Sequence, residues 1–324
     1  RTLTQLDALK EAMTSAYLAE LEKGLEPLTE ELGDLSIEEA AFMARTMTEF
    51  APETFALPAD KVVKRYVDNS VLQMHGKRDA TFTWDEYLNT FYASSADNLR
   101  KSVNEVWRSQ NVDGKLPTLN QYVDRIRLTN NGVNKQQAES IVRTGVNHYS
   151  TQGRLAFRDD NLDVIDREVP IVTFDTRTSS ICISVAAKYG IKGWKVGKSP
   201  VGYPAYHNSC RTGMGFLTIG QTQLEGERQA IEGKKSEEAA KSFERRTKGG
   251  KTTKYSGKKD KALKGAEIAA NTPIAEFLKD QPIWYQNKSL GKTKAEAFRA
   301  GKLDLTNLTD KDLKPATLAE LKLE

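Results

Sequence analysis

The sequence predicts a mainly α-helical α+β protein with three parts: an elongated helical N-terminal part, a small central α+β domain and a short helical C-terminal tail. Apolar residues recur every three or four positions through the first 150 residues and again after residue 273, as they do on one face of a helix. Between these regions, the β-prone run Val164–Phe174 favours a strand. Only 38% of the residues are hydrophobic and 28% are charged, which favours an extended, multi-lobed chain.

Length and composition suggest several regions in one chain. The 324 residues are enough for two or three compact units. We expect a helical N-terminal region (1–115), a core domain with a long helix and a small α+β unit (116–220), a charged helix with a flexible basic arm (221–270), and a helical tail (271–324).

No apolar run approaches the roughly 18 residues that would span a bilayer, and the first residues do not resemble a signal peptide. Two cysteines cannot form a disulfide framework, which favours a reducing compartment.

The N-terminal region should contain four helices. Apolar spacing predicts them over residues 3–24, from residue 36, over 58–76 and over 83–110. Gly24 can end the first, Ser36 and Glu39 form a capping box for the second, and Pro58 can open the third. Aromatic residues at helical spacing in the fourth should belong to the core.

The central region should change from helix to mixed structure. We expect a short helix over 119–128, a turn at 130–132, and a long helix over 136–158 that carries His148 on a mostly polar surface. A strand should then end at Asp175, and a short helix capped by Thr178 or Ser179 should end at Gly190. Strands are expected over 192–196 and 213–219. A charged helix over 220–244, a flexible segment over 245–265 and short helices from residue 273 follow.

Charge is distributed unevenly along the chain. Residues 1–60 hold 4 basic and 13 acidic residues, whereas residues 234–264 hold 12 basic and 4 acidic ones. Such a basic arm favours a polyanion as partner, although charge runs are often only solvated surface. The basic residues of the arm are Lys234, Lys235, Lys241, Arg245, Arg246, Lys248, Lys251, Lys254, Lys258, Lys259, Lys261 and Lys264.

Residues that can carry chemistry concentrate in one window. Both cysteines, Cys182 and Cys210, and one of the three histidines, His207, lie between residues 175 and 211. Cysteine and histidine close together indicate a metal site, a bonded pair or a reactive group. The same window contains acidic and basic residues, so function should be sought here first.

The window and the helix before it match an ordered set of motifs. The set comprises Arg143-Thr144, then Asp175-x-Arg177 ahead of Cys182, then Pro204-x-x-His207-x-x-Cys210-Arg211. This set resembles the minor head, or head morphogenesis, proteins of tailed bacteriophages, typified by the F protein of phage Mu. The resemblance extends from about residue 136 to residue 321. Many members carry further cysteines near the Asp-x-Arg and after the Cys-Arg, where this chain has Ser179 and Thr212.

The resemblance implies a function in the virion. It implies a minor capsid protein, not an enzyme, that is bound at the portal vertex inside the head and assists head assembly and genome packaging or ejection. Partners would be the portal protein, the major capsid or scaffolding protein, and double-stranded genomic DNA, and the chain would pass through the host cytoplasm during assembly. On this interpretation the acidic helices face a protein and the basic arm contacts DNA without sequence preference.

Three interpretations of the Asp/Cys/His window remain open. A zinc site would use Cys182, His207 and Cys210, with Asp175 as fourth ligand. Alternatively, the acid pairs with an arginine and the cysteines are buried small residues or a bonded pair. Finally, a cysteine could be a nucleophile with His207 as its base. This last case implies a head-targeted enzyme, a nuclease or group-transfer effector, but no oxyanion-hole or phosphate-binding sequence accompanies it.

Overall fold

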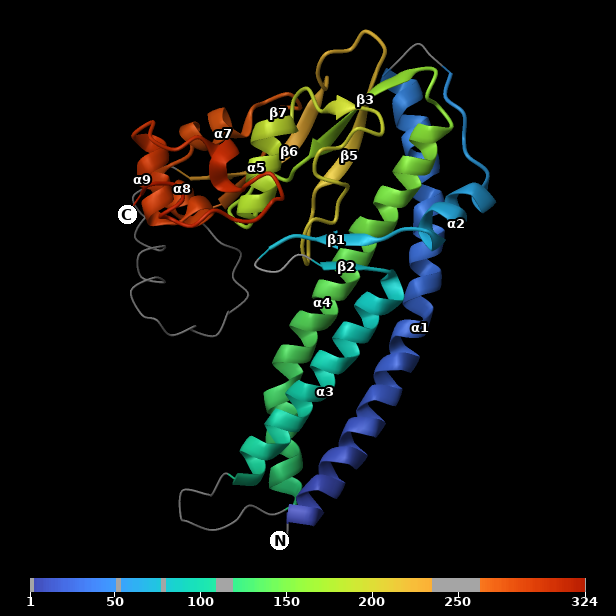
Figure 1. Cartoon of the computed structure of the whole chain (residues 1–324), viewed down its shortest axis with the longest axis vertical. Helices are drawn as coiled ribbons and strands as arrows, with labels where there is room; N and C mark the ends of the chain where they lie inside the picture. Colours follow the sequence, from blue (N-terminus) through green and yellow to red (C-terminus); the bar gives the residue numbers. More distant parts are fainter. Residues whose placement is uncertain (1–2, 51–53, 77–79, 109–118, 235–262, 324) are drawn as a thin grey trace.

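A long helical stalk is joined to a compact α+β head in the computed structural model, which describes residues 3–50, 54–76, 80–108, 119–234 and 263–323 (Figure 1). The stalk consists of α1 (Leu3–Phe50), α3 (Trp84–Arg108) and α4 (Leu119–Asp159), which pack against one another. The head contains the small sheets and the C-terminal helices. The predicted mainly helical α+β class is therefore confirmed.

Helix α1 continues through the residue at which the sequence predicts its end. Gly24, Pro27 and Gly33 all lie inside this 48-residue helix, so the predicted end at Gly24 is wrong. Interior Gly and Pro cost a helix about 1 and 3 kcal/mol, but a row of leucines on α1 packs into a core shared with α3 and α4. The leucines of this row are Leu21, Leu25, Leu28, Leu32 and Leu35.

Ser36 lies inside α1 and does not begin a helix. Its side chain is fully buried, and its hydroxyl donates to the carbonyl of Gly33 at 2.6 Å. Helix α4 crosses α1 at this point, since a Cβ on Gly153 would lie only 2.0 Å from the carbonyl oxygen of Ser36. The predicted capping box is therefore wrong, and a small residue on each helix permits a close crossing.

Helix α2 (Asp60–Asp68) is shorter than predicted. The chain after it forms β1 (Leu72–Met74), which pairs antiparallel with β2 (Ala80–Phe82). The predicted continuation of the helix to residue 76 is therefore wrong. Leu72 and Met74 are buried and Gln73 between them is exposed, the alternation of a strand. In a segment of three residues, the two-residue alternation of a strand cannot be distinguished from the 3.6-residue period of a helix.

Helix α3 agrees with the predicted span. Thr83 and Glu86 form a reciprocal capping box, in which each side chain accepts a hydrogen bond from the backbone N–H of the other. The aromatic residues Tyr87 and Phe91 are buried in the stalk core beside Trp84, so their predicted core role is confirmed. The side chain of Trp107, predicted to share this core, lies outside the described residues.

Helix α4 is continuous where the sequence predicts two helices separated by a turn at 130–132. It ends at Asp159, as predicted, and Asn161 then bonds back to the backbone of Phe157 and Ala56. The predicted domain limit at 115/116 lies outside the described residues. Because α3 and α4 on either side of that limit share one core, they form one structural unit.

The central unit is a three-stranded antiparallel sheet in the order β4 (Trp194–Lys195), β3 (Ile165–Ile171), β5 (Gly213–Thr218). Helix α5 (Ser180–Tyr189) packs against it. The predicted cap at Ser179 and helix end at Gly190 are confirmed. Strand β3 ends at Ile171, four residues earlier than predicted.

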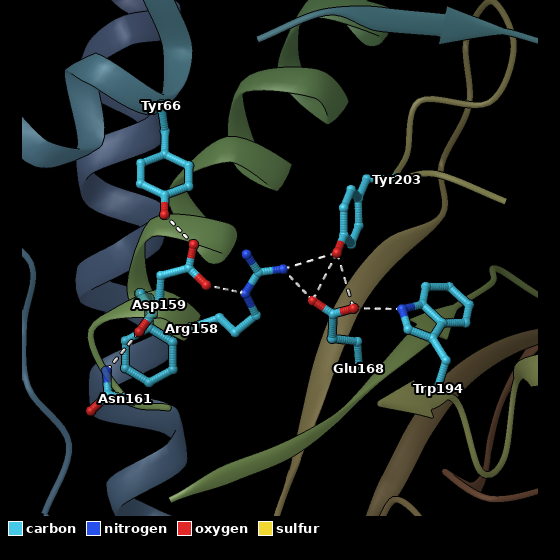
Figure 2. A network of polar contacts seen from close by, with 8 residues as sticks. Tyr66, Arg158, Asp159, Asn161, Glu168, Trp194 and Tyr203 are labelled. Carbon is cyan, nitrogen blue, oxygen red and sulfur yellow. Dashed lines mark hydrogen bonds and ion pairs between the residues drawn. The ribbon is translucent and has the colours of Figure 1, made fainter. Parts of the chain in front are cut away.

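A buried polar network joins the stalk to this sheet (Figure 2). Glu168 of β3 is inaccessible to solvent, and it accepts hydrogen bonds from Arg158 of α4, from Tyr203 at 3.1 Å and from Trp194 at 2.5 Å. Arg158 also pairs with Asp159, which accepts a hydrogen bond from Tyr66 of α2. A buried carboxylate without partners would cost several kcal/mol of folding free energy. Glu168 must therefore keep its contact with Arg158, and this contact holds the end of α4 against the sheet.

The segment after β5 departs from the prediction. Residues 227–233 form strand β6 (Glu227–Gly233), which pairs antiparallel with β7 (Leu263–Ala269). The predicted charged helix over 220–244 is therefore wrong for residues 220–234, and the rest of its span lies outside the described residues. The predicted flexibility of residues 263–265 is also wrong, because they belong to β7. The two strands are separated by some thirty residues, and both contain few apolar residues. Neither strand therefore shows the alternating apolar pattern from which a strand can be predicted.

The C-terminal tail is helical, as predicted, as far as Leu308, with α7 (Ile274–Asp280), α8 (Ile283–Leu290), α9 (Lys292–Arg299) and the 3₁₀ helix η1 (Leu305–Leu308). Residues 309–323 form turns and an isolated bridge between Thr309 and Pro315, so the predicted helix to the end of the chain is wrong there. It packs on α5 in one core. Ser184 of α5 donates a hydrogen bond to the carbonyl of Thr306 and accepts one from Thr309. The tail therefore belongs to the same folded unit as the central sheet.

Candidate metal centre

Two loops bring both cysteines and His207 together at the start of α5. Ser179 caps this helix by accepting a hydrogen bond from the backbone N–H of Cys182, which places Cys182 in the first turn. The loop before β5 supplies the other two side chains. His207 Nε2 lies 3.1 Å from Cys182 Sγ, and Cys210 Sγ lies 3.8 Å from the same sulfur.

The donor atoms are spaced as ligands of one ion. The two sulfurs and a ring nitrogen of His207 all lie within 4.8 Å of one another. With Zn–S bonds of about 2.3 Å, two thiolates of a tetrahedral site stand about 3.8 Å apart, and the separation of the sulfurs matches this edge. It is also far longer than the roughly 2.05 Å of a disulfide, and both cysteines are free.

The histidine ring is oriented by a backbone contact. Its Nδ1 lies 2.9 Å from the carbonyl oxygen of Asn208, so Nδ1 carries the proton and donates it to this carbonyl. Nε2 is then the atom with a lone pair, and it faces the sulfurs. This is the tautomer that a metal-binding histidine needs.

The thiols titrate as a pair. The hydrogen bond from Cys182, together with His207, holds the pKa of Cys210 below its usual value, while the pKa of Cys182 is raised by its contact with Cys210 and by burial. Burial lowers the pKa of His207, but its contacts with Cys210 outweigh burial and raise the pKa overall. The cluster therefore favours one thiolate, which is the form that binds a metal.

Two hydroxyl groups complete the surroundings of the donor atoms. Ser179 Oγ lies 2.8 Å from His207 Nε2, and Thr212 Oγ1 lies 3.2 Å from Cys182 Sγ. These are the positions at which the resemblance leads us to expect further cysteines. In sequence they are departures from a cysteine-rich metal site, whereas the fold places both hydroxyls against the candidate ligands.

Asp175 does not act as the predicted fourth ligand. Its carboxylate binds both guanidinium nitrogens of Arg211 at 2.5 and 2.8 Å, and it also accepts hydrogen bonds from the backbone of Arg177 and the hydroxyl of Thr178. Burial raises the pKa of Asp175, but the bonds with Arg211 outweigh it and lower the pKa overall. The carboxylate is fully engaged and holds the two loops together.

The other motif residues have separate positions. Thr144 is buried in α4 and accepts a hydrogen bond from the backbone N–H of Ser209 at 2.9 Å, which attaches the cysteine-bearing loop to the stalk. Pro204 begins this loop and is buried. Arg143, in contrast, is half exposed and pairs with Glu139 on its own helix. It does not join the cluster.

The environment of His148 differs from the one that the sequence predicts. His148 of α4 is 1% exposed, and its Nε2 lies 2.8 Å from the hydroxyl of Ser70. The predicted polar surface around it is therefore wrong. Burial lowers the pKa of His148 to about 4.

The space at the cluster is small. The hollow formed by His207, Cys182 and their neighbours measures about 20 Å³, which is enough for an ion or a water molecule. Cys182 and Cys210 are 4% and 1% exposed. A nucleophile must be reached by its substrate, so this geometry favours the binding of an ion over covalent catalysis.

Most of the predicted basic arm lies outside the described residues. Of its twelve basic residues, only Lys234, which is exposed at the end of β6, and Lys264 are described. Lys264 lies on β7 and pairs with Glu232 of β6 at 3.0 Å. It is therefore part of a sheet, and the proposed contact with DNA depends on the residues between the two strands.

Comparisons with protein-family models, with curated proteins and with solved structures gave no match to this chain. Within the described part of the chain, no helix is both long and apolar enough to cross a membrane.

Proposed function

We propose that the chain is a structural component of the head of a tailed bacteriophage, bound at the portal vertex, where it assists head assembly and genome packaging or ejection. One observation supports this proposal most: the motif segments that carry the resemblance converge in space. Thr144 contacts the loop of Cys210, Arg211 binds Asp175, and Cys182 faces His207. A shared fold would require this convergence.

The cluster has a structural role in this proposal. Cys182, His207 and Cys210 hold a zinc ion, and a water molecule or the hydroxyl of Ser179 supplies the fourth position. The separation of the sulfurs and the small hollow support zinc. Zinc at this point would fasten the loop before β5 to the start of α5, in a unit whose sheet has only three strands.

The basic arm supplies the contact with DNA. Twelve basic residues between 234 and 264 would neutralise phosphates and release counterions, which gives affinity without sequence preference. The stalk supplies a surface for a protein partner such as the portal. The chain would enter the virion from the host cytoplasm and remain inside the head.

A head-targeted enzyme is the second candidate. It is favoured by the 3.1 Å contact between His207 and Cys182, which resembles a nucleophile with its base. Burial of both thiols and the hollow of about 20 Å³ weigh against it. A reagent that alkylates accessible thiolates distinguishes the two, because a catalytic cysteine reacts in the folded protein whereas a buried metal ligand reacts only after the metal is removed.

Cross-linking within purified particles tests the head function directly. The chain should occur in a few copies per particle, and its cross-links should concentrate on the portal protein. Absence of the chain from purified particles, or cross-links spread evenly over the shell, would contradict the proposal.

Metal analysis tests the zinc site separately. Purified protein should contain one zinc per chain, and a strong chelator should lower its melting temperature. Cys210→Ser should lose the metal, whereas Ser199→Cys, in a loop that does not line the hollow, should retain it. Metal-free protein with a melting curve indifferent to chelator would exclude zinc and leave the head function untouched.

A further inference from the structure

A wide hollow lies next to the cysteine cluster and shares Val172, Thr173 and Arg211 with the small hollow there. It measures about 500 Å³ and is enclosed by the C-terminal half of α1, the strand β5 and the start of β6. Its lining is mostly apolar and includes Phe42, Met43 and Met47 of α1, Met214 and Phe216 of β5, and Leu224. Hollows of this size and character commonly bind ligands.

One wall of the hollow carries a partly buried cation, Arg228. The guanidinium group of Arg228 lies 4.1 Å from the centre of the Phe174 ring, and its Nε is buried without a hydrogen-bond partner. Within the described residues Arg228 forms no ion pair. Burial lowers its pKa to about 10, the direction expected for a cation without a counter-charge nearby. A negatively charged group placed here would offset the cost of burying it.

The other arginines of the hollow are already paired. Arg154 pairs with Glu39, and Arg211 binds Asp175. Two exposed acids, Glu225 and Glu227, line the same hollow.

These two acids leave Arg228 accessible to an anion. Neither makes an ion pair with Arg228 in the described structure, although both line the hollow. A ligand with several negative charges would be repelled by them. The hollow therefore favours a ligand with a single negative charge.

Apolar surface continues beyond the hollow. Phe42 at its edge is 46% exposed, and a second hollow shares Arg154, Arg211 and Gly213 with the first. This second hollow is lined by Val142 and Val146 of α4, which are also exposed. The shared residues make the two hollows one continuous surface, and exposed apolar patches of this kind mark protein interaction sites.

We propose that this surface binds a segment of a partner protein, which inserts apolar side chains into the hollow and places one carboxylate on Arg228. The inference goes beyond the proposed head function and does not depend on it. Charge complementarity selects the partner: an apolar segment without an acid would leave Arg228 buried and unpaired, and a strongly acidic segment would meet Glu225 and Glu227.

A selection from random peptides tests the inference with the full chain. Random 12-residue peptides displayed on their own messenger RNA are first depleted of those that bind the Thr46→Trp variant. The remaining peptides are then selected for binding to the wild-type protein. Thr46 lines the hollow, so tryptophan there fills it from α1. The recovered peptides should combine apolar residues with one Asp or Glu. Their affinity, measured by fluorescence anisotropy, should fall at least tenfold for Arg228→Met and much less for Arg228→Lys.

Control variants separate binding from folding. Thr48→Trp adds the same side chain two positions along α1, where Thr48 is exposed, and it should bind the selected peptides as the wild type does. Replacing the acid of a selected peptide by its amide should weaken binding as much as Arg228→Met does. Peptides without an acid, or peptides that bind Arg228→Met unchanged, would overturn the inference. The inference would also be overturned if the wild-type protein self-associated and the Thr46→Trp variant did not, because the surface would then join two copies of this chain.

Discussion

Arg211 binds the carboxylate of Asp175 through two nitrogens, at 2.5 and 2.8 Å, and Arg211 is the residue that directly follows Cys210. The ion pair therefore ties the backbone of one candidate ligand to the loop that leads into α5 and Cys182. Asp175 is buried, whereas Arg211 is one-third exposed. This salt bridge therefore joins the two halves of the candidate metal centre, together with the contacts of Ser179 with His207 and of Thr212 with Cys182.

Replacing Asp175 by Asn should destabilise the protein. The amide keeps the shape of the side chain but leaves Arg211 without its charge partner, and we expect a loss of about 2 kcal/mol, less than for a fully buried pair because Arg211 is partly exposed. Urea unfolding at pH 7 measures the change. The exposed Arg177 lies 3.6 Å from the same carboxylate, so Arg177→Gln should cost at most about 0.5 kcal/mol.

The effect of Asp175→Asn should disappear in acid. Arg211 outweighs burial and holds the pKa of Asp175 below its usual value. The carboxylate therefore contributes stability above the unfolded pKa of about 4, and this contribution is lost as pH falls through the lower folded pKa. A difference in unfolding free energy that stays constant below pH 4 would show that the ion pair contributes little.

His148 should make the protein sensitive to mild acid. Burial lowers its pKa to about 4, so the folded state holds the neutral ring. Stability is complete above the unfolded pKa of about 6.5 and decreases as pH falls toward 4, by about 3 kcal/mol in total. His148→Gln should flatten the fall in unfolding free energy between pH 7 and pH 4.5.

The control for this pH effect lies on the same helix. Arg143 is half exposed on α4 and does not titrate in this range, so Arg143→Gln should show the same pH dependence as the wild type. If His148→Gln keeps the full slope, the acid sensitivity originates elsewhere.

A cysteine in place of Ser179 should strengthen the metal site. Ser179 Oγ lies 2.8 Å from His207 Nε2, so a thiolate there can supply a fourth ligand. We expect at least a tenfold rise in zinc affinity, measured by competition with a coloured chelator. Thr212→Cys, beside Cys182, should act in the same direction. Ser199→Cys, away from the hollow, provides the control, and an equal rise there would show unspecific binding by any added thiol.

Neutralising the basic arm should weaken the salt dependence of DNA binding. Replacing Lys248, Lys251, Lys254, Lys258 and Lys259 by Gln leaves β6 and β7 untouched. Each lost phosphate contact should reduce the slope of log K against log salt by about 0.9. Lys264→Gln should change this slope little, since Lys264 pairs with Glu232. A slope unaltered by the five substitutions would place the DNA contact elsewhere or exclude it.

Local sequence predicted those parts of the site that depend on neighbouring residues. The cap at Ser179, the helix to Gly190 and the position of Cys182 in its first turn follow from a few adjacent side chains. The window itself was apparent because cysteine and histidine are rare in this chain. The sequence leaves the partner of Asp175 open between a metal ion and an arginine, and the structure shows the ion pair with Arg211.

By itself, the sequence determined the helical class, the extent of α3, the strands β4 and β5 and the grouping of Cys182, His207 and Cys210, because these depend on short-range periodicity and composition. Only the tertiary structure decided that α1 and α4 run unbroken, that residues 227–233 form a strand and that His148 is buried. In each case the free energy comes from contacts between distant segments. Burial of the leucine row keeps α1 helical through Gly24 and Pro27, and pairing with β7 makes a strand of a sequence that has no strong preference of its own.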